Sequence, residues 1–437
     1  MLTRHINQRS TCRTLLTRDA MRLASALRYR LHAVMLERCK LLLAALCCSI
    51  PGFAAGASCS GDALIDVTLP GGAQWELCWE LRAEEGIVLQ EVSYKAPAHT
   101  LRSVLKEASL AQVNVAYDDG SPGKRLVTDT ANGAGFGANI RTLLPSDCPG
   151  GNLRADNGNN VLCTRVVPRG YAFKSYSIVQ QGNLLTLESR ATIGPHSYIV
   201  RWNFYDDGTI EPRIGMSGDL PLIGSNANHG WLLDQSNRVG VGFNTSYFFR
   251  LDFDLASTGN NESVEEFTVT PSANRLEKSL SVAKITSESA RVVSPDLKRS
   301  WRVRENSGGV TNSDGRPISY HLEPLHTAHR YTGTNLEAWA QNDFWVTRYN
   351  PCERFVVDNP TAGGCASDID GFLNGENIDG ADVVLWYKIN YHHLPRSEDE
   401  PEIQMHWDGF FILPRDWTAT NPLASLMYLN GLPRGSC

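Results

Sequence analysis

The feature that most constrains this chain is a recurring pattern of short, β-branched and aromatic runs separated by turn residues. Runs of this kind are typical of β-strands, and the breakers Asp206–Gly208 and Asn312–Gly315 are typical of hairpin turns. Helical periodicity is scarce, and its best candidate is Leu101–Ala108. The pattern therefore predicts an all-β fold, a large antiparallel β-sandwich. Representative strand-like runs are Gly86–Val92, Tyr198–Phe204, Tyr247–Leu251, Phe344–Thr347 and Val383–Tyr387.

Charge divides the chain into two unequal parts. Residues 1–57 carry nine Lys/Arg and two Asp/Glu, a net +7, whereas the remaining 380 residues carry a net −13. A net negative chain gives no bulk electrostatic support for a nucleic-acid partner. No apolar run reaches the length of a membrane span, so none is expected.

The N-terminal part contains the pattern of an export signal. Arg38 and Lys40 precede an apolar stretch over Leu41–Ile50, and an Ala-x-Ala cleavage pattern ends at Ala57. We therefore predict an N-terminal extension over residues 1–57 with its signal at 35–57, and one mature domain over 58–437. A short buried helix is the alternative. Export predicts a secreted or periplasmic protein.

Seven cysteines remain after residue 57, and six of them form sequential pairs at loop-sized separations. Because an exported protein can hold disulfides, we predict three bridges, although other connectivities stay open. Cys437 is left unpaired, and the absence of any C-x-x-C spacing after residue 57 argues against a zinc site. The predicted pairs are Cys59–Cys78, Cys148–Cys163 and Cys352–Cys365.

Six segments, in order, resemble motifs of the catalytic domain of copper amine oxidases over about residues 62–425. The resemblance implies a β-sandwich, a homodimer and the oxidation of primary amines. In that family a tyrosine-derived quinone (topaquinone) reacts with the amine, three histidines hold the copper that forms the quinone, and an aspartate is the base. The segments are Glu85–Tyr94, Trp202–Ile210, Arg250–Asp252, Trp345–Tyr349, His393–Pro401 and Asn421–Pro422.

At the catalytic positions the chain departs from the family. The quinone tyrosine is replaced by His196, and the first two copper histidines by Phe243 and Thr245. The third copper position is His393. The base position falls on Thr130, or on Asp129 with a small insertion. Imidazole cannot become the quinone and Phe has no lone pair, so copper and topaquinone are not expected.

A peripheral calcium site of the family is kept at the level of sequence. Its carboxylates would be Asp252, Asp254 and Asp382, and its carbonyl oxygens those of Phe253 and Val383. Hard oxygen ligands of this kind suit calcium, so calcium is the one cofactor expected. Three solvated acids at strand ends are the alternative. The acidic run Glu398–Glu400 is expected to be a solvated face.

Three functions remain open. The favoured one is a secreted non-oxidase that binds a small amine, a peptide or a protein partner in the former substrate cleft. The second is an enzyme of altered chemistry that uses His196, or a new metal site of His196 and His393 with His392 or His406. The third is an amine oxidase whose quinone forms on a shifted tyrosine, Tyr198.

Overall fold

The computed structural model describes most of the chain after residue 55. The described ranges are 56–119, 125–126, 135–175, 178–223, 226–233, 238–256, 260–306, 308–325, 328–333, 337–424, 428–429 and 432–433. Contacts divide the chain into one unit of residues 1–54 and a second of 55–437. The predicted signal over 35–57 thus lies almost wholly outside the described residues, as do Asp129, Thr130 and Cys437.

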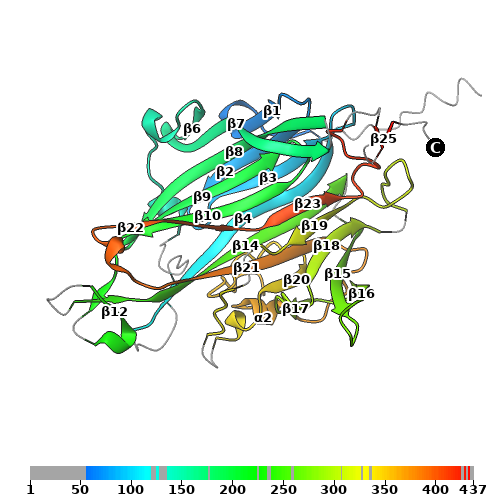
Figure 1. Cartoon of the computed structure of the whole chain (residues 1–437). Coiled ribbons are helices and arrows are strands. Elements are labelled where there is room, and N and C mark those ends of the chain that lie inside the picture. Colours follow the sequence, from blue (N-terminus) through cyan, green and yellow to red (C-terminus); the bar gives the residue numbers. More distant parts are fainter. Residues whose placement is uncertain are drawn as a thin grey trace, which may run out of the picture. The chain divides into compact units, whose positions relative to one another are not determined.

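The second unit contains a nine-stranded antiparallel sheet (Figure 1). Its central strand is β14 (Phe243–Ala256), which pairs with β4 (Arg102–Tyr117) on one side and β21 (Val383–His393) on the other. The remaining strands are β1 (Leu64–Thr68), β2 (Gln74–Arg82), β3 (Gly86–Lys95), β5 (Arg125–Leu126), β20 (Phe344–Arg348) and β17 (Ser289–Arg291).

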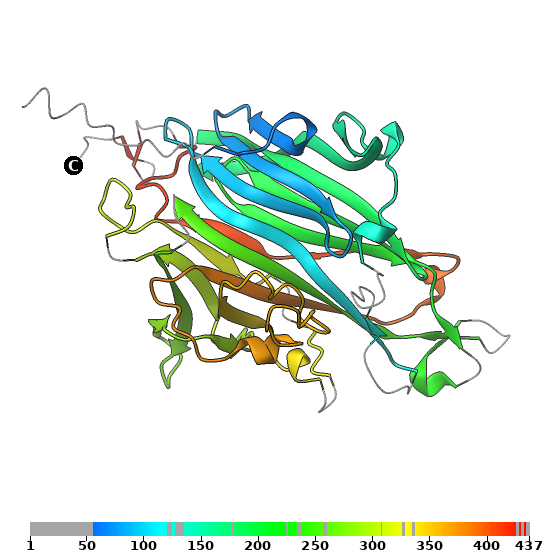
Figure 2. The same cartoon turned by 180° about the vertical axis from the view of Figure 1, so that it is seen from behind.

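An eleven-stranded antiparallel sheet packs against it, and Figure 2 shows the same arrangement from behind. Its middle is formed by β9 (His196–Tyr205) and β10 (Ile210–Gly218), which are joined by the predicted turn at Asp206–Gly208. The other strands are β16 (Lys278–Ile285), β15 (Glu262–Pro271), β18 (Ser300–Glu305), β19 (Ser319–Glu323), β23 (Phe411–Arg415), β8 (Ile178–Ile193), β7 (Asn159–Ser175), β6 (Asn152–Asp156) and β22 (Ile403–Gly409).

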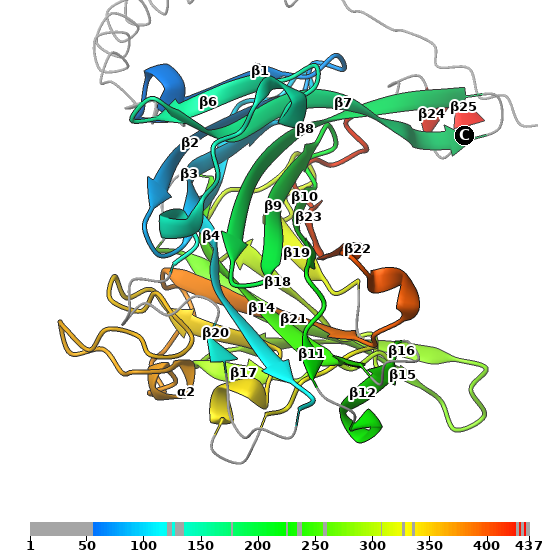
Figure 3. The same cartoon turned by 90° about the vertical axis from the view of Figure 1, so that its left-hand side faces the viewer.

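Two small sheets and a few short helical turns complete the described part of the chain (Figure 3). The sheets consist of β11 (Leu222–Ile223), β13 (Val239–Val241) and β12 (Gly230–Leu232), and of β24 (Tyr428–Leu429) and β25 (Leu432–Pro433). The helical elements are α2 (Ile369–Phe372) and the 3-10 turns Gly61–Ala63, Gly137–Asn139, Pro145–Asp147, Ala227–His229, Ala338–Ala340 and Ser397–Asp399. None of the helices in the described ranges has the length and apolar character that a membrane span needs.

The main core lies between the two large sheets and is held by aromatic rings that cross from one sheet to the other. Trp301 of β18 stacks parallel on Phe344 of β20, with ring centroids 4.0 Å apart. Trp202 of β9 meets Phe249 of β14 edge to face at 6.0 Å. All four side chains are buried. The predicted fold, a large antiparallel β-sandwich, is therefore confirmed.

One predicted element is wrong. Leu101–Ala108, the best helical candidate, lies almost entirely within strand β4. β4 is paired on both edges, by β3 and β14, and most of its residues are buried. The register of β4 against β14 shifts between Leu105 and Glu107, so that Val104 and Leu105 are buried next to each other and the alternation of a strand is lost. The buried residues Val104, Leu105 and Ala108 then have the spacing of an amphipathic helix.

Three disulfides join segments that are close in sequence. They are Cys59–Cys78, Cys148–Cys163 and Cys352–Cys365, the three predicted pairs. The first ties the segment before β1 to β2, and the second attaches a 3-10 turn to β7. Disulfides of this kind are typical of proteins that mature in an oxidising compartment.

Replacing Trp301 with alanine should remove the stack on Phe344 and leave a cavity in the main core. We expect the free energy of unfolding to fall by about 3–5 kcal/mol, measured by chemical denaturation. The matched control is Trp231→Ala on β12, because that indole is 55% exposed. It should change stability by less than about 0.5 kcal/mol. Equal effects of the two substitutions would contradict this description of the core.

Candidate functional site

Three positions singled out in the sequence meet inside the sandwich. Phe243, the first residue of β14, is paired in register with His393, the last residue of β21. Their rings stack at 5.0 Å, with planes 27° apart. On the neighbouring sheet, His196 begins β9, and its ring lies 5.1 Å from that of Phe243. All three side chains are buried, so the phenyl ring contacts both imidazoles within the protein interior.

Two further side chains border this group. Tyr117, at the end of β4, pairs in register with Phe243, and its hydroxyl lies 3.5 Å from His196 Nε2. Thr245 follows on the same face of β14 and is fully buried. Tyr117 was not predicted from sequence, because its place beside Phe243 depends on the pairing of strands more than 120 residues apart.

The imidazoles of this group are held in the neutral form. Burial and the neighbouring His393 lower the pKa of His196 to about 4, against an opposing effect of Asp219. Burial also lowers the pKa of His393, while Asp399 opposes that shift. His393 Nε2 lies 2.9 Å from Asp399 Oδ2, so this ring nitrogen is already engaged.

Asp399 corrects one prediction. The run Glu398–Glu400 was expected to be a solvated face, yet Asp399 is fully buried. Its carboxylate also accepts a hydrogen bond from the backbone N–H of Arg396 at 2.9 Å. A carboxylate that orients a histidine and closes a 3-10 turn has a structural reason to be buried. The only feature of the sequence that could have indicated this buried contact is the position of Asp399, six residues after His393.

The donor set does not fit a three-histidine copper centre. Phe243 offers no lone pair, the Thr245 hydroxyl is a poor ligand for Cu(II), and one nitrogen of His393 pairs with Asp399. His392 pairs with Asp118, and His406 pairs with Asp408. The structure therefore does not gather His392 or His406 into one site with His196. Within the described ranges, no three His, Cys, Asp or Glu side chains form a ready metal site.

The shifted tyrosine lies beside the replaced one. Tyr198 is fully buried on β9, and its ring meets His196 at 6.2 Å and Phe136 at 5.6 Å. Its hydroxyl has no hydrogen-bond partner in the described part of the chain. Burial raises the pKa of this phenol well above its ordinary value. The two candidates for the base, Asp129 and Thr130, lie outside the described residues.

The predicted calcium residues lie together where β14 and β21 pair. Phe253 and Val383 are partners in register, with Asp252 and Asp254 on β14 and Asp382 directly before β21. Burial, together with Asp382 and Asp254, raises the pKa of Asp252 to about 8 against the opposing effect of Arg250. One buried oxygen of Asp252 and one of Asp382 have no hydrogen-bond partner among the described residues. Such orphaned carboxylate oxygens fit a hard cation, although the three carboxylates would have to move together to bind it.

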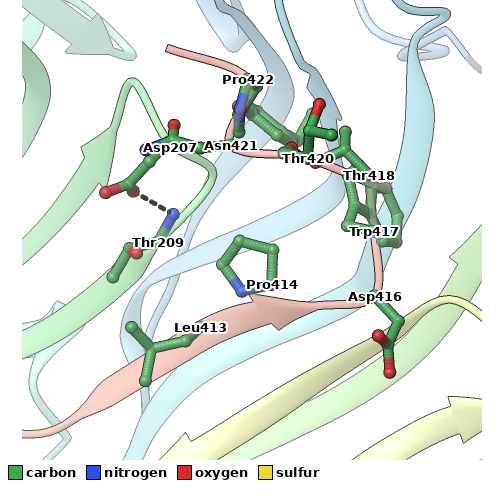
Figure 4. Close-up of a pocket in the computed structure, with 11 residues that line it drawn as sticks. Asp207, Thr209, Leu413, Pro414, Asp416, Trp417, Thr418, Thr420, Asn421 and Pro422 are labelled. Carbon is green, nitrogen blue, oxygen red and sulfur yellow. Dashed lines mark hydrogen bonds between the residues drawn. The ribbon is translucent and has the colours of Figure 1, made fainter. Parts of the chain in front are cut away.

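A cavity of about 340 Å³ opens beside the turn between β9 and β10 (Figure 4). Trp417 and Tyr94 are among its walls, and Asp207 and Asp416 come from opposite sides. The carboxylate of Asp207 is paired with Arg169 at 2.9 Å and accepts a hydrogen bond from the backbone N–H of Thr209. This cavity contains none of the site residues predicted from the sequence.

Comparison with known proteins points to one family. The family model described as "Copper amine oxidase, enzyme domain" matches residues 169–429. A primary amine oxidase of Pisum sativum is 24% identical over 395 residues, which cover 80% of this chain and 58% of the relative. A histamine oxidase of Arthrobacter globiformis is 24% identical over 390 residues, covering 80% and 56%. The chain thus spans less than two thirds of the length of these relatives.

Solved structures agree on the fold. A copper-containing benzylamine oxidase from Hansenula polymorpha superimposes with a TM-score of 0.69 at 18% identity, covering 84% of this chain and 63% of that one. The amine oxidase of Aspergillus nidulans gives a TM-score of 0.67 at 23% identity, covering 80% and 52%. At these identities the likeness shows the fold alone.

Replacing Asp399 with alanine should leave His393 and the turn at Arg396 without their buried acceptor. We expect a loss of about 2–4 kcal/mol in the free energy of unfolding, measured by chemical denaturation. Glu398→Ala is the matched control, because that neighbouring carboxylate is exposed. If both variants keep the stability of the parent, Asp399 does not have the structural role assigned to it.

Proposed function

This chain belongs to the copper amine oxidase family, and we propose that it is a member that binds a ligand without oxidising amines. The observation that carries the proposal is the position of Phe243. Its ring lies against both His196 and His393, at the place where the family motif calls for a metal-binding imidazole. An apolar ring packed there supports a structural use of the former metal site.

The chemistry of the replaced groups supports the same proposal. Amine oxidation in this family needs a carbonyl made from a tyrosine, three imidazole ligands and a base within reach of the substrate proton. At the matching positions this chain offers an imidazole at His196, a phenyl at Phe243 and a hydroxyl at Thr245. Several parts of one mechanism are replaced together, while the motifs around them are kept.

The alternative is a primary-amine oxidase that uses Tyr198, with an aldehyde, ammonia and hydrogen peroxide as products. Tyr198 lies beside His196, which supports the alternative, but Phe243 and Thr245 would still be the metal-facing residues. Acid–base chemistry at His196 is a second alternative. The burial of that imidazole and its pKa of about 4 argue against it, because a general base works best near the ambient pH.

The ligand of the non-oxidase would be a small amine, a peptide or a protein partner that enters the former substrate cleft. A net charge of −13 after residue 57 favours the approach of a cation. Three disulfides and the predicted signal support a secreted or periplasmic location. A homodimer is proposed from family membership alone.

Calcium is proposed as a structural ion at Asp252, Asp254 and Asp382, with the carbonyl oxygens of Phe253 and Val383. An ion there would neutralise carboxylates that now repel one another and would tie β14 to β21. The orphaned oxygens of Asp252 and Asp382 support this assignment.

The purified protein should release no hydrogen peroxide with benzylamine, histamine or methylamine, and should show no quinone absorbance after exposure to copper. The physical reason is that an imidazole at position 196 cannot be converted to the quinone. A peroxide-coupled assay and an absorbance spectrum measure both, with an active family member as the positive control. Turnover that disappears in Tyr198→Phe would instead establish the alternative.

Restoring the missing imidazoles provides a complementary test of the metal site. The double variant Phe243→His, Thr245→His should gain close to one copper per chain by mass spectrometry, because it completes a three-histidine set with His393. The parent should hold none after the same exposure, and the single variant Phe243→His should fall well below the double variant. Copper near one per chain in the parent would contradict the proposal.

Calcium should raise the thermal midpoint of the parent by several degrees, because an ion that binds only the folded state stabilises it by mass action. Asp382→Asn should abolish most of this shift, since it removes one carboxylate from the cluster. Asp379→Asn is a nearby control whose carboxylate is paired with Lys284. The same calcium response in all three proteins would show that the ion binds elsewhere.

A further inference from the structure

The face of the eleven-stranded sheet that turns away from the main core carries three basic side chains around one aromatic ring. The ring is that of Phe267 on β15, which is buried but does not belong to the main core. The guanidinium carbon of Arg415 lies 4.7 Å from its centroid and that of Arg302 lies 5.3 Å away. The imidazole of His321 meets the same ring edge to face at 5.1 Å.

Strand register places these groups on one face. Arg302 of β18 is directly opposite His321 of β19, and Arg415 of β23 is opposite Ser319, two residues from His321. Phe267 is opposite Ser300, two residues from Arg302. Because side chains alternate along a strand, all four point to the same side of the sheet. Four separate strands therefore contribute to one cluster.

Two acidic groups near this cluster are already engaged, whereas Glu323, on the same face of β19 as His321, is exposed and forms no ion pair in the described ranges. Glu265 lies 2.7 Å from Arg302 and 2.7 Å from Arg304, and Asp416 lies 3.4 Å from Arg302 and 3.5 Å from Arg316. No carboxylate in the described ranges forms an ion pair with Arg415, whose side chain is exposed.

One ring nitrogen of His321 is also without a hydrogen bond among the described residues. This nitrogen, Nδ1, is buried. Burial, together with the nearby Arg415 and Arg302, lowers the pKa of His321 to about 4. Arg415 therefore offers guanidinium donors that no carboxylate in the described ranges uses, on a chain that carries a net −6.

We propose that Arg415 and His321, with Arg302 beside them, bind a tetrahedral oxyanion, phosphate or sulfate, either free or as an ester of a larger ligand. A guanidinium presents several N–H donors in a plane, which suits the oxygens of such anions. Stacking on Phe267 restricts both guanidinium groups before the anion arrives, so less side-chain entropy is lost on binding. The anion would pair with Arg415, whose charge is balanced by no carboxylate in the described ranges, and would favour protonation of His321. This site is separate from the positions that decide amine oxidation.

The first test measures binding of inorganic phosphate and of sulfate to the whole protein by calorimetry, at constant ionic strength maintained with chloride. We expect saturable binding of one anion per chain. Arg415→Gln and His321→Asn should each weaken it about tenfold, the equivalent of losing one charge-assisted hydrogen bond. The matched control is Arg316→Gln, which makes the same change of charge at a neighbouring arginine that does not stack on Phe267. It should bind within about twofold of the parent.

The affinities for phosphate and sulfate are then compared. A site for phosphate esters should bind phosphate more tightly, and a site for sulfate esters should bind sulfate more tightly. Circular dichroism establishes that each variant is folded. If the Arg415 variant is unfolded, the His321 variant alone decides the question. Equal binding by the parent and a folded His321 or Arg415 variant would overturn the proposal, as would binding no stronger than that of chloride.

A second readout follows the imidazole itself. In protein carrying carbon-13-labelled histidine, the pKa of His321 should rise from about 4 towards the ordinary value for histidine when phosphate or sulfate is added, because the bound anion favours the protonated ring. By linkage, anion affinity should then increase as the pH falls. A role of Arg415 limited to covering Phe267 would leave this titration unchanged, and that result would contradict the proposal.

Discussion

The hydrogen-bond register of β14 is the constraint on which the rest of this structure depends. β14 lies between β4 and β21, and nearly all of its side chains are buried. One end of the strand sets Phe243 opposite His393, and the other sets Phe253 opposite Val383. A slip by one residue would turn every side chain of β14 to the opposite face. The placement of Phe243 beside His393 and the placement of the carboxylate cluster therefore both depend on the register of this one strand.

Phe243, at the position that matches a copper ligand in the family motif, is part of the main hydrophobic core. Two imidazoles and a phenyl ring occupy the interior between the sheets, and each imidazole is kept neutral by burial. Neutral rings in contact gain dispersion and hydrophobic stabilisation without the cost of a buried charge. The hydrogen bond between His393 and Asp399 fixes the orientation of that imidazole.

Charge is distributed in this protein in a way that its net value does not reveal. Carboxylates gather where β14 and β21 pair, and burial together with mutual repulsion raises their pKa values. On the far face of the other sheet, Arg302, Arg415 and His321 converge around Phe267. Groups of like charge at close range raise the free energy of the isolated protein and favour binding of an opposite charge. We propose a hard cation as the ligand of the first cluster and an oxyanion as the ligand of the second.

The sequence by itself determined the class of the fold and the turn at Asp206–Gly208, and it predicted the cysteine pairs while other connectivities stayed open. Each of these depends on local alternation, on turn residues or on short separations along the chain. Collinear motifs also identified the positions of His196, Phe243 and His393. The first part of strand β4 was not recognised, because a shift of its register against β14 interrupts the alternation between Leu105 and Glu107.

Only the tertiary structure decided which side chains touch. The burial of Asp399, the contact of Tyr117 with His196, and the meeting of Arg415 with Phe267 all required strands distant in sequence to pair. Alternation along a strand predicts which face of the sheet a side chain occupies. It does not predict which other strand will pair with that strand. Those contacts are set by the packing of whole sheets, and for that reason they could be read only from the folded chain.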